Sequence, residues 1–182
     1  PAMLTAPRRT APLVGLALAL PMLATACDGD SAPQAGPANA ADALLREVQK
    51  RGYRDWERAP KHEARVATNA PHGRGVEVFV DEHMAEALAN ADGLGRTAWP
   101  EGATIVLEGY AAAALAEGAP PDEPTQLAIL QKRGGSWHWE QYEAEDLGRP
   151  RFAGRPDVCV GCHLGTQDFV RGFSLPQPVE EE

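Results

Sequence analysis

The feature that most constrains this chain is a short stretch near its C-terminus, "CVGCH" at residues 159–163. It places two thiols three residues apart and an imidazole directly behind the second thiol, in a chain with only three cysteines. Three such groups so close together indicate a single bound species that uses all of them.

A C-x-x-C pair has three common uses. A thioredoxin-type redox pair needs a βαβ context, whereas Pro150 and Pro156 predict a loop before this motif. A structural zinc ion needs four ligands, but the chain has no second cysteine pair, and His163 follows Cys162 too closely for both to bind one tetrahedral ion well. C-x-x-C-H is the signature of covalent haem attachment. The motif therefore predicts one haem c, with thioether bonds to Cys159 and Cys162 and with His163 as the proximal iron ligand.

The N-terminal part of the chain predicts export. Arg8 and Arg9 precede an apolar run that ends in Ala-Thr-Ala directly before Cys27. This order is typical of a secretory signal peptide, here residues 1–26. Small residues before a cysteine resemble a bacterial lipobox, which predicts lipidation of Cys27, while the same Ala-Thr-Ala also suits ordinary cleavage. The protein is expected on the periplasmic face of a bacterial membrane as a lipoprotein, or soluble in the periplasm.

Two segments follow the expected cleavage site. Residues 27–41 are small, polar and interrupted by prolines, which predicts a flexible tether. Residues 42–182 form one domain by length and patterning. The formal net charge is −9 and no long basic run occurs, so nucleic acid is not expected as a partner. The partners that remain are a small diatomic ligand or a redox protein, the membrane through a lipid at Cys27, and a second copy of the chain in a homodimer.

Hydrophobic periodicity predicts an α+β domain that is mainly antiparallel β-sheet with a few flanking helices. Apolar residues at helical spacing predict a helix from about residue 42 to Gly52, and a second, short helix over "EHMAEALANA". Alternation predicts a strand over "GVEVFVDE", with Phe79 on the face opposite the valines. Further strands are expected in "ATIVLEGY" and on both sides of a hairpin turn at Gly134 and Gly135. The haem motif is expected in a loop behind the last strand.

Several stretches, read in order, resemble the cytochrome P-460 family, which includes the cytochromes c′-beta. They are "YRDW", "GVEVFVDEHMAEAL", "WPEGATIVLEGY", "GSWHWEQY" and the late "CVGCH". The resemblance implies a mostly antiparallel β fold with one c-type haem, whose five-coordinate iron has a histidine below and an open distal face. Members of the family oxidise hydroxylamine or bind nitric oxide and related small ligands.

Two positions depart from the hydroxylamine-oxidising members of that family. Those members have a lysine that cross-links to the porphyrin, and Leu107 stands at that position in this chain. They also carry a distal carboxylate that moves protons, where this chain has Leu127 or Gln126. The resemblance therefore implies that Leu107 and Leu127 border the haem, and that the cross-link and the proton shuttle are both missing.

Three function classes remain, and the sixth iron ligand separates the first two. The expected function is an exported mono-haem c-type cytochrome with a five-coordinate iron that binds small ligands such as nitric oxide. The alternative is a six-coordinate periplasmic electron carrier, and the third class is a haem oxidoreductase acting on hydroxylamine or nitric oxide. The candidates for a sixth ligand are Met84, which is expected in the core, and the histidines His62, His72, His83 and His138.

Overall fold

The computed structural model describes residues 38–68, 71–89, 96–113 and 122–176, so the predicted signal peptide and most of the predicted tether lie outside the described residues. An antiparallel sheet forms the centre of the domain, with the strand order β1-β3-β4-β5-β6-β7 and with β2 beside β3. The strands are β1 (Glu57–Arg58), β2 (Val66–Ala67), β3 (Gly75–Val80), β4 (Thr104–Tyr110), β5 (Gln126–Arg133), β6 (Ser136–Glu143) and β7 (Phe152–Gly154). The helices of the described part are α1 (Ala38–Lys50), α2 (Glu82–Ala89) and α3 (Asp157–His163), with short 3-10 turns η1 (Tyr53–Asp55) and η2 (Gln167–Phe169). The predicted α+β architecture built on an antiparallel sheet is confirmed.

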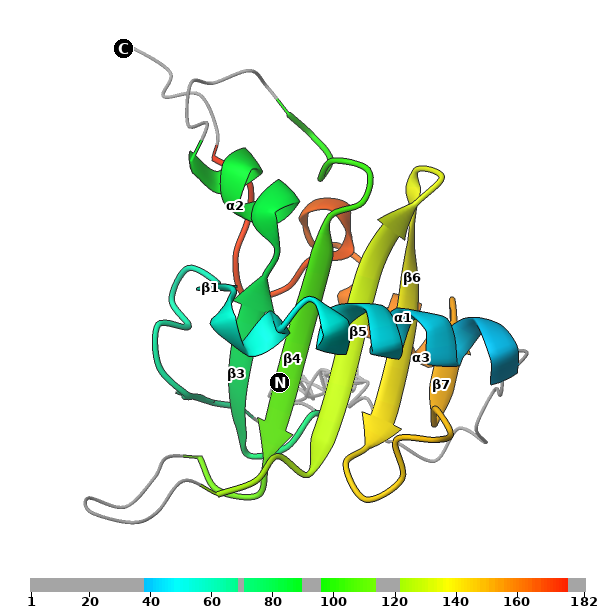
Figure 1. Cartoon of the computed structure of the whole chain (residues 1–182). Coiled ribbons are helices and arrows are strands. Elements are labelled where there is room, and N and C mark those ends of the chain that lie inside the picture. The colour runs from blue at the N-terminus through cyan, green and yellow to red at the C-terminus, as the bar shows by residue number, and fades with distance from the viewer. Residues whose placement is uncertain (1–37, 69–70, 90–95, 114–121, 177–182) are drawn as a thin grey trace, which may run out of the picture.

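Helix α1 lies across one face of the sheet (Figure 1). Its apolar side chains Leu44, Leu45 and Val48 have the spacing of one helical face, and all three are buried. The helix begins at Ala38, inside the segment expected to be tether, because the alanines before Leu44 have the highest helix propensity. The sheet residues in the cluster beneath α1 are Phe79, Val106, Leu127, Ile129 and Tyr142.

The opposite face of the sheet carries the second and larger apolar cluster. Successive strand residues point to opposite faces, so Val78, Ile105, Leu130 and Trp139 lie together on this side, away from Phe79. Helix α2, helix α3 and the chain that follows α3 lie on this side (Figure 1). They contribute Met84, Ala87, Val160, Phe169, Val170, Phe173 and Leu175 to the cluster or to its edge. This face therefore holds the haem motif.

The β5–β6 hairpin fixes which side chains of these two strands share a face. Gly134 and Gly135 both have positive φ, 57° and 75°, which is the backbone of a tight two-residue hairpin turn. The Glu101 carboxylate accepts hydrogen bonds from the amides of both glycines. The turn pairs Leu130 with Trp139 across the strands. Both side chains therefore point to the haem-motif face.

The haem motif lies on helix α3, which corrects the prediction of a loop. Pro156 has extended backbone (φ −66°, ψ 137°) and stands at the N-cap of α3. A proline is tolerated at a helix start because the amide there has no helical partner, so Pro156 precedes a helix rather than a loop. The segment before it was also expected to be a loop, but it contains β7, which pairs with β6. None of the helices in the described residues has the length and apolar character needed to cross a membrane.

Candidate haem site

Helix α3 brings the three residues of the predicted haem motif to one cavity. Cys162 and His163 follow Cys159 by three and four residues, and this spacing places all three on one side of a helix. All three line a cavity of about 100 Å³ between α3, the edge of the sheet and the loop before β3. The other residues that line it are Pro71, His72, Trp139, Gln141, Arg151, Phe152 and Val158.

The imidazole of His163 is oriented by a backbone carbonyl. Its Nδ1 lies 2.7 Å from the carbonyl oxygen of Phe169, and because a carbonyl only accepts, Nδ1 carries the proton and donates it. Burial lowers the pKa of His163 below its ordinary value, although the hydrogen bond to Phe169 acts in the opposite direction. The neutral ring therefore has its lone pair on Nε2, the atom that a haem iron requires.

Cys159 is a free thiol in the cavity wall. Burial raises its pKa to about 11, so it is protonated near neutral pH. A protonated thiol is the form that would add to a vinyl group of a porphyrin to give a thioether bond.

Of the five candidates for a sixth ligand, His72 lies in the same cavity as His163. Burial is the main reason that the pKa of His72 falls to about 4, and the nearby imidazole of His163 lowers it further. The Nδ1 atom of His72 is buried and has no hydrogen-bond partner among the described residues. Gly109 allows this loop to approach β4, because a Cβ at that position would lie 1.7 Å from the His72 carbonyl oxygen.

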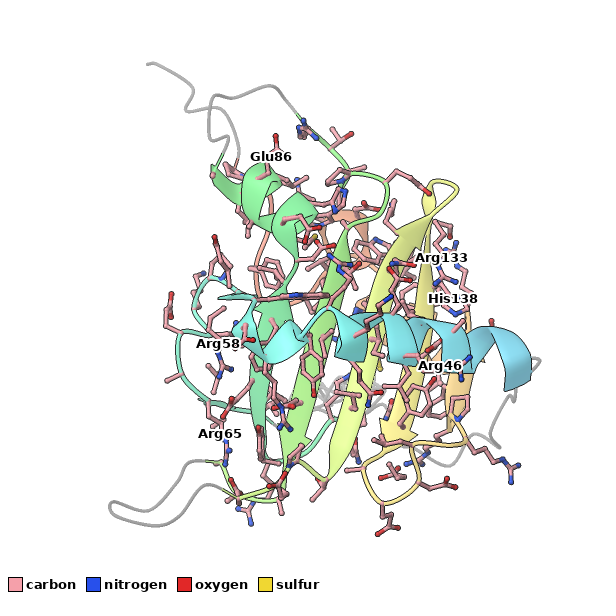
Figure 2. All side chains as sticks on the ribbon, in the orientation of Figure 1. Arg46, Arg58, Arg65, Glu86, Arg133 and His138 are labelled. Carbon is pink, nitrogen blue, oxygen red and sulfur yellow. The ribbon has the colours of Figure 1, made fainter. Side chains whose placement is uncertain are left out.

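The other four candidates lie outside this cavity. Met84 is fully buried in the core cluster, as predicted. His62 contacts the Pro60 carbonyl and the Phe173 ring, and His83 lies beside Asp81. His138, labelled in Figure 2, points to the α1 side of the sheet and lies 3.1 Å from a carboxylate oxygen of Glu140. The sixth-ligand question therefore reduces to His72.

The residues around the cavity fit a haem. His72 Nδ1 and Trp139 Nε1 are buried polar atoms without a partner among the described residues, and both residues line the cavity. A bound group that accepts hydrogen bonds would give both atoms a partner. Arg151, whose guanidinium is paired with Glu143 at 3.2 Å, places a positive charge at the cavity wall. The cavity is smaller than the roughly 300–1,000 Å³ of clefts that hold small molecules, so haem attachment must widen it.

The two leucines expected beside the haem lie on opposite faces of the sheet. Leu107 packs against the apolar cluster on the haem-motif face, against which Cys159 and Phe169 also pack. Leu127 belongs to the cluster under α1 and lines a separate cavity of about 520 Å³ beside η1. Because strand residues alternate between faces, its neighbour Gln126 is on the haem-motif side, where it accepts a hydrogen bond from Gln141 at 3.1 Å. The expectation for Leu127 is corrected in favour of Gln126.

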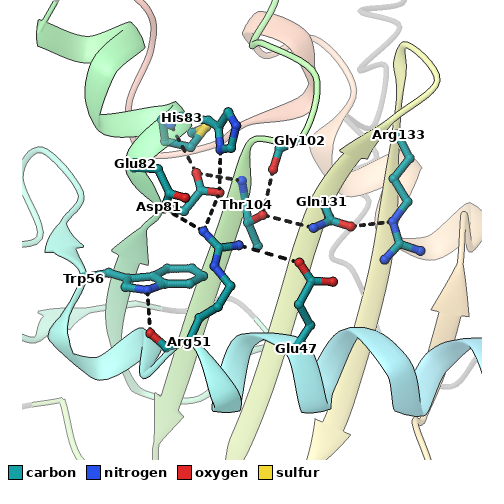
Figure 3. A network of polar contacts seen from close by, with 11 residues as sticks. Glu47, Arg51, Trp56, Asp81, Glu82, His83, Gly102, Thr104, Gln131 and Arg133 are labelled. Atoms are coloured by element: carbon teal, nitrogen blue, oxygen red, sulfur yellow. Dashed lines mark hydrogen bonds and ion pairs between the residues drawn. The ribbon is translucent and has the colours of Figure 1, made fainter.

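A second cluster of metal-type side chains, Asp81, Glu82 and His83, has a structural explanation (Figure 3). The buried Asp81 carboxylate accepts hydrogen bonds from the backbone amides of Met84 and Thr104, at 3.2 and 3.1 Å. The guanidinium of Arg51 lies 3.4 Å from Asp81 and 2.6 Å from Glu82. A cation already neutralises these carboxylates, so the cluster connects α1 to α2.

Sequence reasoning missed the groups that position His163. The Phe169 carbonyl is a backbone group, and no residue type marks it in the sequence. Gln141 could have been found, because it follows Trp139 at the two-residue period of a strand and therefore shares its face. His72 is one of five candidates for a sixth ligand in the sequence, and the fold is what brings it to the cavity.

The comparisons with known proteins agree with this site. A family model described as Cytochrome P460 matches residues 50–170, more than half of the chain. The matched region includes the whole sheet, helix α3 and every residue that lines the cavity. No curated protein and no solved structure matches the chain. The chain belongs to the cytochrome P460 family, a family of haem-binding cytochromes.

Proposed function

We propose that the protein is an exported mono-haem c-type cytochrome that binds a small ligand such as nitric oxide at an open iron site. Cys159 and Cys162 would hold the haem through thioether bonds, and His163 would ligate the iron through Nε2. One observation carries the proposal: the Phe169 carbonyl fixes the proton of His163 on Nδ1, at 2.7 Å, beside a cavity that both cysteines line. This is the arrangement that an iron-ligating histidine needs.

The bound haem would supply the iron at which a small ligand or an electron is received. The protein's own residues would make the surroundings of that iron largely apolar, with Arg151 as a charged side chain among the residues that line the cavity. Leu107 contributes an apolar side chain, and Gln126 and Gln141 contribute amides that are hydrogen-bonded to each other. An uncharged diatomic molecule needs little hydrogen bonding and suits such surroundings.

Oxidation of hydroxylamine is the less favoured activity. It requires removal of protons, and none of the described residues that line the cavity is a carboxylate. Gln126, on the haem-motif face, is an amide and cannot act as a base. Leu107 has no nucleophilic atom with which to cross-link a porphyrin. The lining of the cavity and the side chains of Gln126 and Leu107 support a binding function rather than an enzyme.

His72 supports a second candidate function. An imidazole in the same cavity as His163, neutral near pH 7 and with an unpartnered buried nitrogen, has the properties of a second iron ligand. With both axial positions filled by histidine, the protein would be a six-coordinate electron carrier. Its partner would then be a redox protein in place of a diatomic ligand.

The proposed location follows from the N-terminal sequence, which lies outside the described residues. A signal peptide over residues 1–26 and a lipid on Cys27 would hold the domain at the periplasmic face of a membrane. Cleavage without lipidation would give a soluble periplasmic protein. In both cases the chain is exported, as covalent haem attachment requires. Both locations also allow a homodimer.

The absorption spectrum of the ferrous protein, recorded with and without carbon monoxide, tests the proposed function. An open iron site predicts a high-spin ferrous spectrum that shifts when carbon monoxide is added. A low-spin ferrous spectrum that carbon monoxide leaves unchanged would contradict ligand binding and would favour the electron carrier. A protein without a haem spectrum after maturation in a haem-attaching periplasm would contradict both functions.

A further inference from the structure

A buried ion pair connects strand β5 to the turn that follows the haem motif. The ammonium nitrogen of Lys132 lies 2.6 and 2.7 Å from the two carboxylate oxygens of Asp168. The side chains are only 6% and 11% exposed. The backbone amide of Trp99 donates a third hydrogen bond to the same carboxylate, at 2.8 Å. Lys132 and Trp99, both distant in the sequence from the haem motif, therefore hold Asp168 in the turn that follows the motif.

The backbone at this turn is held in an unfavourable conformation. Asp168 and Phe169 have φ values of 46° and 61°, in the left-handed region that non-glycine residues rarely adopt. Such a residue is energetically unfavourable and persists only where its surroundings enforce it. The Lys132 and Trp99 contacts to the Asp168 carboxylate are such surroundings. They hold the backbone that leads into the Phe169 carbonyl.

That carbonyl is the acceptor for the Nδ1 proton of His163, at 2.7 Å. Trp139 contacts both residues of this hydrogen bond. Its ring centroid lies 6.2 Å from that of His163 and 6.2 Å from that of Phe169, each edge to face. A continuous set of contacts thus runs from Lys132 through Asp168 and Phe169 to His163. It ends at the ring that offers Nε2 to the iron.

We propose that the Lys132–Asp168 ion pair is a positioning device for the iron ligand: it fixes the Phe169 carbonyl and thereby the orientation and electron donation of His163. The inference rests on the proposed haem function. A histidine whose Nδ1–H is strongly hydrogen-bonded donates more electron density to iron and stabilises its ferric state. Weakening the ion pair should therefore raise the reduction potential of the haem, although neither side chain lines the cavity.

The test measures the midpoint potential of the purified haem-loaded protein in four variants. Lys132→Met removes the cation, Asp168→Asn removes the anion at nearly constant volume, and Lys132→Arg keeps the charge. The control is Arg65→Met. Arg65 is a similarly buried cation, with a side chain 7% exposed and with Glu77 as an ion-pair partner at 3.3 Å. It lies on the β3 side of the sheet, away from β7 (Figure 2).

The positioning device predicts a rise in midpoint potential for Lys132→Met and Asp168→Asn, with Lys132→Arg and Arg65→Met close to wild type. Unchanged potentials in Asp168→Asn and Lys132→Met, or an equal rise in Arg65→Met, would show a purely structural ion pair and overturn the inference. If Lys132→Met does not accumulate, Asp168→Asn decides. Wild-type protein that acquires no haem would overturn both the proposed function and the inference. Haem-loaded variants with unchanged potentials would overturn the inference alone, so the two failures are distinguishable.

Discussion

His72 and His163 line one cavity, although the first lies in the loop before β3 and the second at the end of α3. Each imidazole is neutral near pH 7, since burial lowers the pKa of both. The close approach of the His72 carbonyl to Gly109 fixes the position of its loop against β4. The two residues thus bring two imidazoles to one cavity.

Replacement of His72 separates the two proposed functions. With an open iron site, His72→Ala should leave the ferrous spectrum high-spin and should preserve its shift with carbon monoxide. His138→Ala is the matched control, because His138 lies on the other face of the sheet beside Glu140. A change from a low-spin to a high-spin spectrum in His72→Ala alone would identify His72 as the sixth ligand and replace ligand binding by electron transfer.

Introducing a lysine at position 107 should not create an enzyme. Leu107→Lys supplies the side chain that the cross-link needs, but Gln126 remains an amide that cannot take a proton. We expect no hydroxylamine-dependent reduction of an electron acceptor above the wild-type level. The informative comparison is the double variant Leu107→Lys with Gln126→Glu. Activity in Leu107→Lys alone would show that the proton acceptor is not at the Gln126 position.

The buried carboxylate of Glu108 should make stability depend on acid pH. It accepts hydrogen bonds from Tyr53, Tyr110 and Arg54 at 2.6, 2.6 and 2.7 Å. Burial alone would raise the pKa of Glu108, but these hydrogen bonds lower it overall. A lowered pKa stabilises the fold above the ordinary glutamate value of about 4.3, and the stabilisation is lost as the pH falls through the folded pKa.

Urea unfolding of Glu108→Gln tests this account. At pH 7 the variant should lose about 1.5–3 kcal/mol of unfolding free energy, the contribution of a hydrogen bond to a charged group. The difference from wild type should narrow below about pH 4, where the wild-type carboxylate also becomes protonated. Glu47→Gln, at an exposed position on α1, serves as the control. An equal loss at pH 7 and at pH 3 would mean that the charge of Glu108 is not what stabilises the fold.

Much of the fold could be predicted because its signals are local. The alternation of Val78 and Phe79 between two faces, and the paired glycines of the hairpin, follow from backbone geometry and are seen in the structure. The sequence predicts a loop at the haem motif because Pro156 is typical of loops, whereas in the structure Pro156 stands at the N-cap of α3. Proline is common both in loops and at helix starts, and the tertiary contacts of the segment determine which of the two structures forms.

The site was less predictable, since it is assembled from distant segments. Leu127 and Gln126 are adjacent, and which of them faces the cavity depends on the strand register that β4 and β6 impose. The Lys132–Asp168 ion pair joins a strand to a turn, and no spacing in the sequence links the two. The carbonyl of Phe169 carries no side-chain signature. Such contacts become visible when the segments are folded together.

The N-terminal prediction can be checked by cell fractionation. Lipidation of Cys27 should place the wild-type protein in the membrane fraction, and Cys27→Ser, which cannot accept the lipid, should release it to the soluble fraction. Wild-type protein that is already soluble and lacks a lipid at residue 27 would favour ordinary cleavage after Ala26. The haem domain should be unaffected in both forms, because the described fold begins at Ala38.

The central claim is that Cys159, Cys162 and His163 hold one haem, and the mass of the intact protein tests it most directly. Protein matured in a haem-attaching periplasm should carry the added mass of a single haem that survives acid extraction. The double variant Cys159→Ser with Cys162→Ser should carry none, whereas His163→Ala should keep a covalent haem with an altered spectrum. A wild-type mass equal to that of the bare polypeptide, under conditions in which other c-type cytochromes mature, would contradict the account.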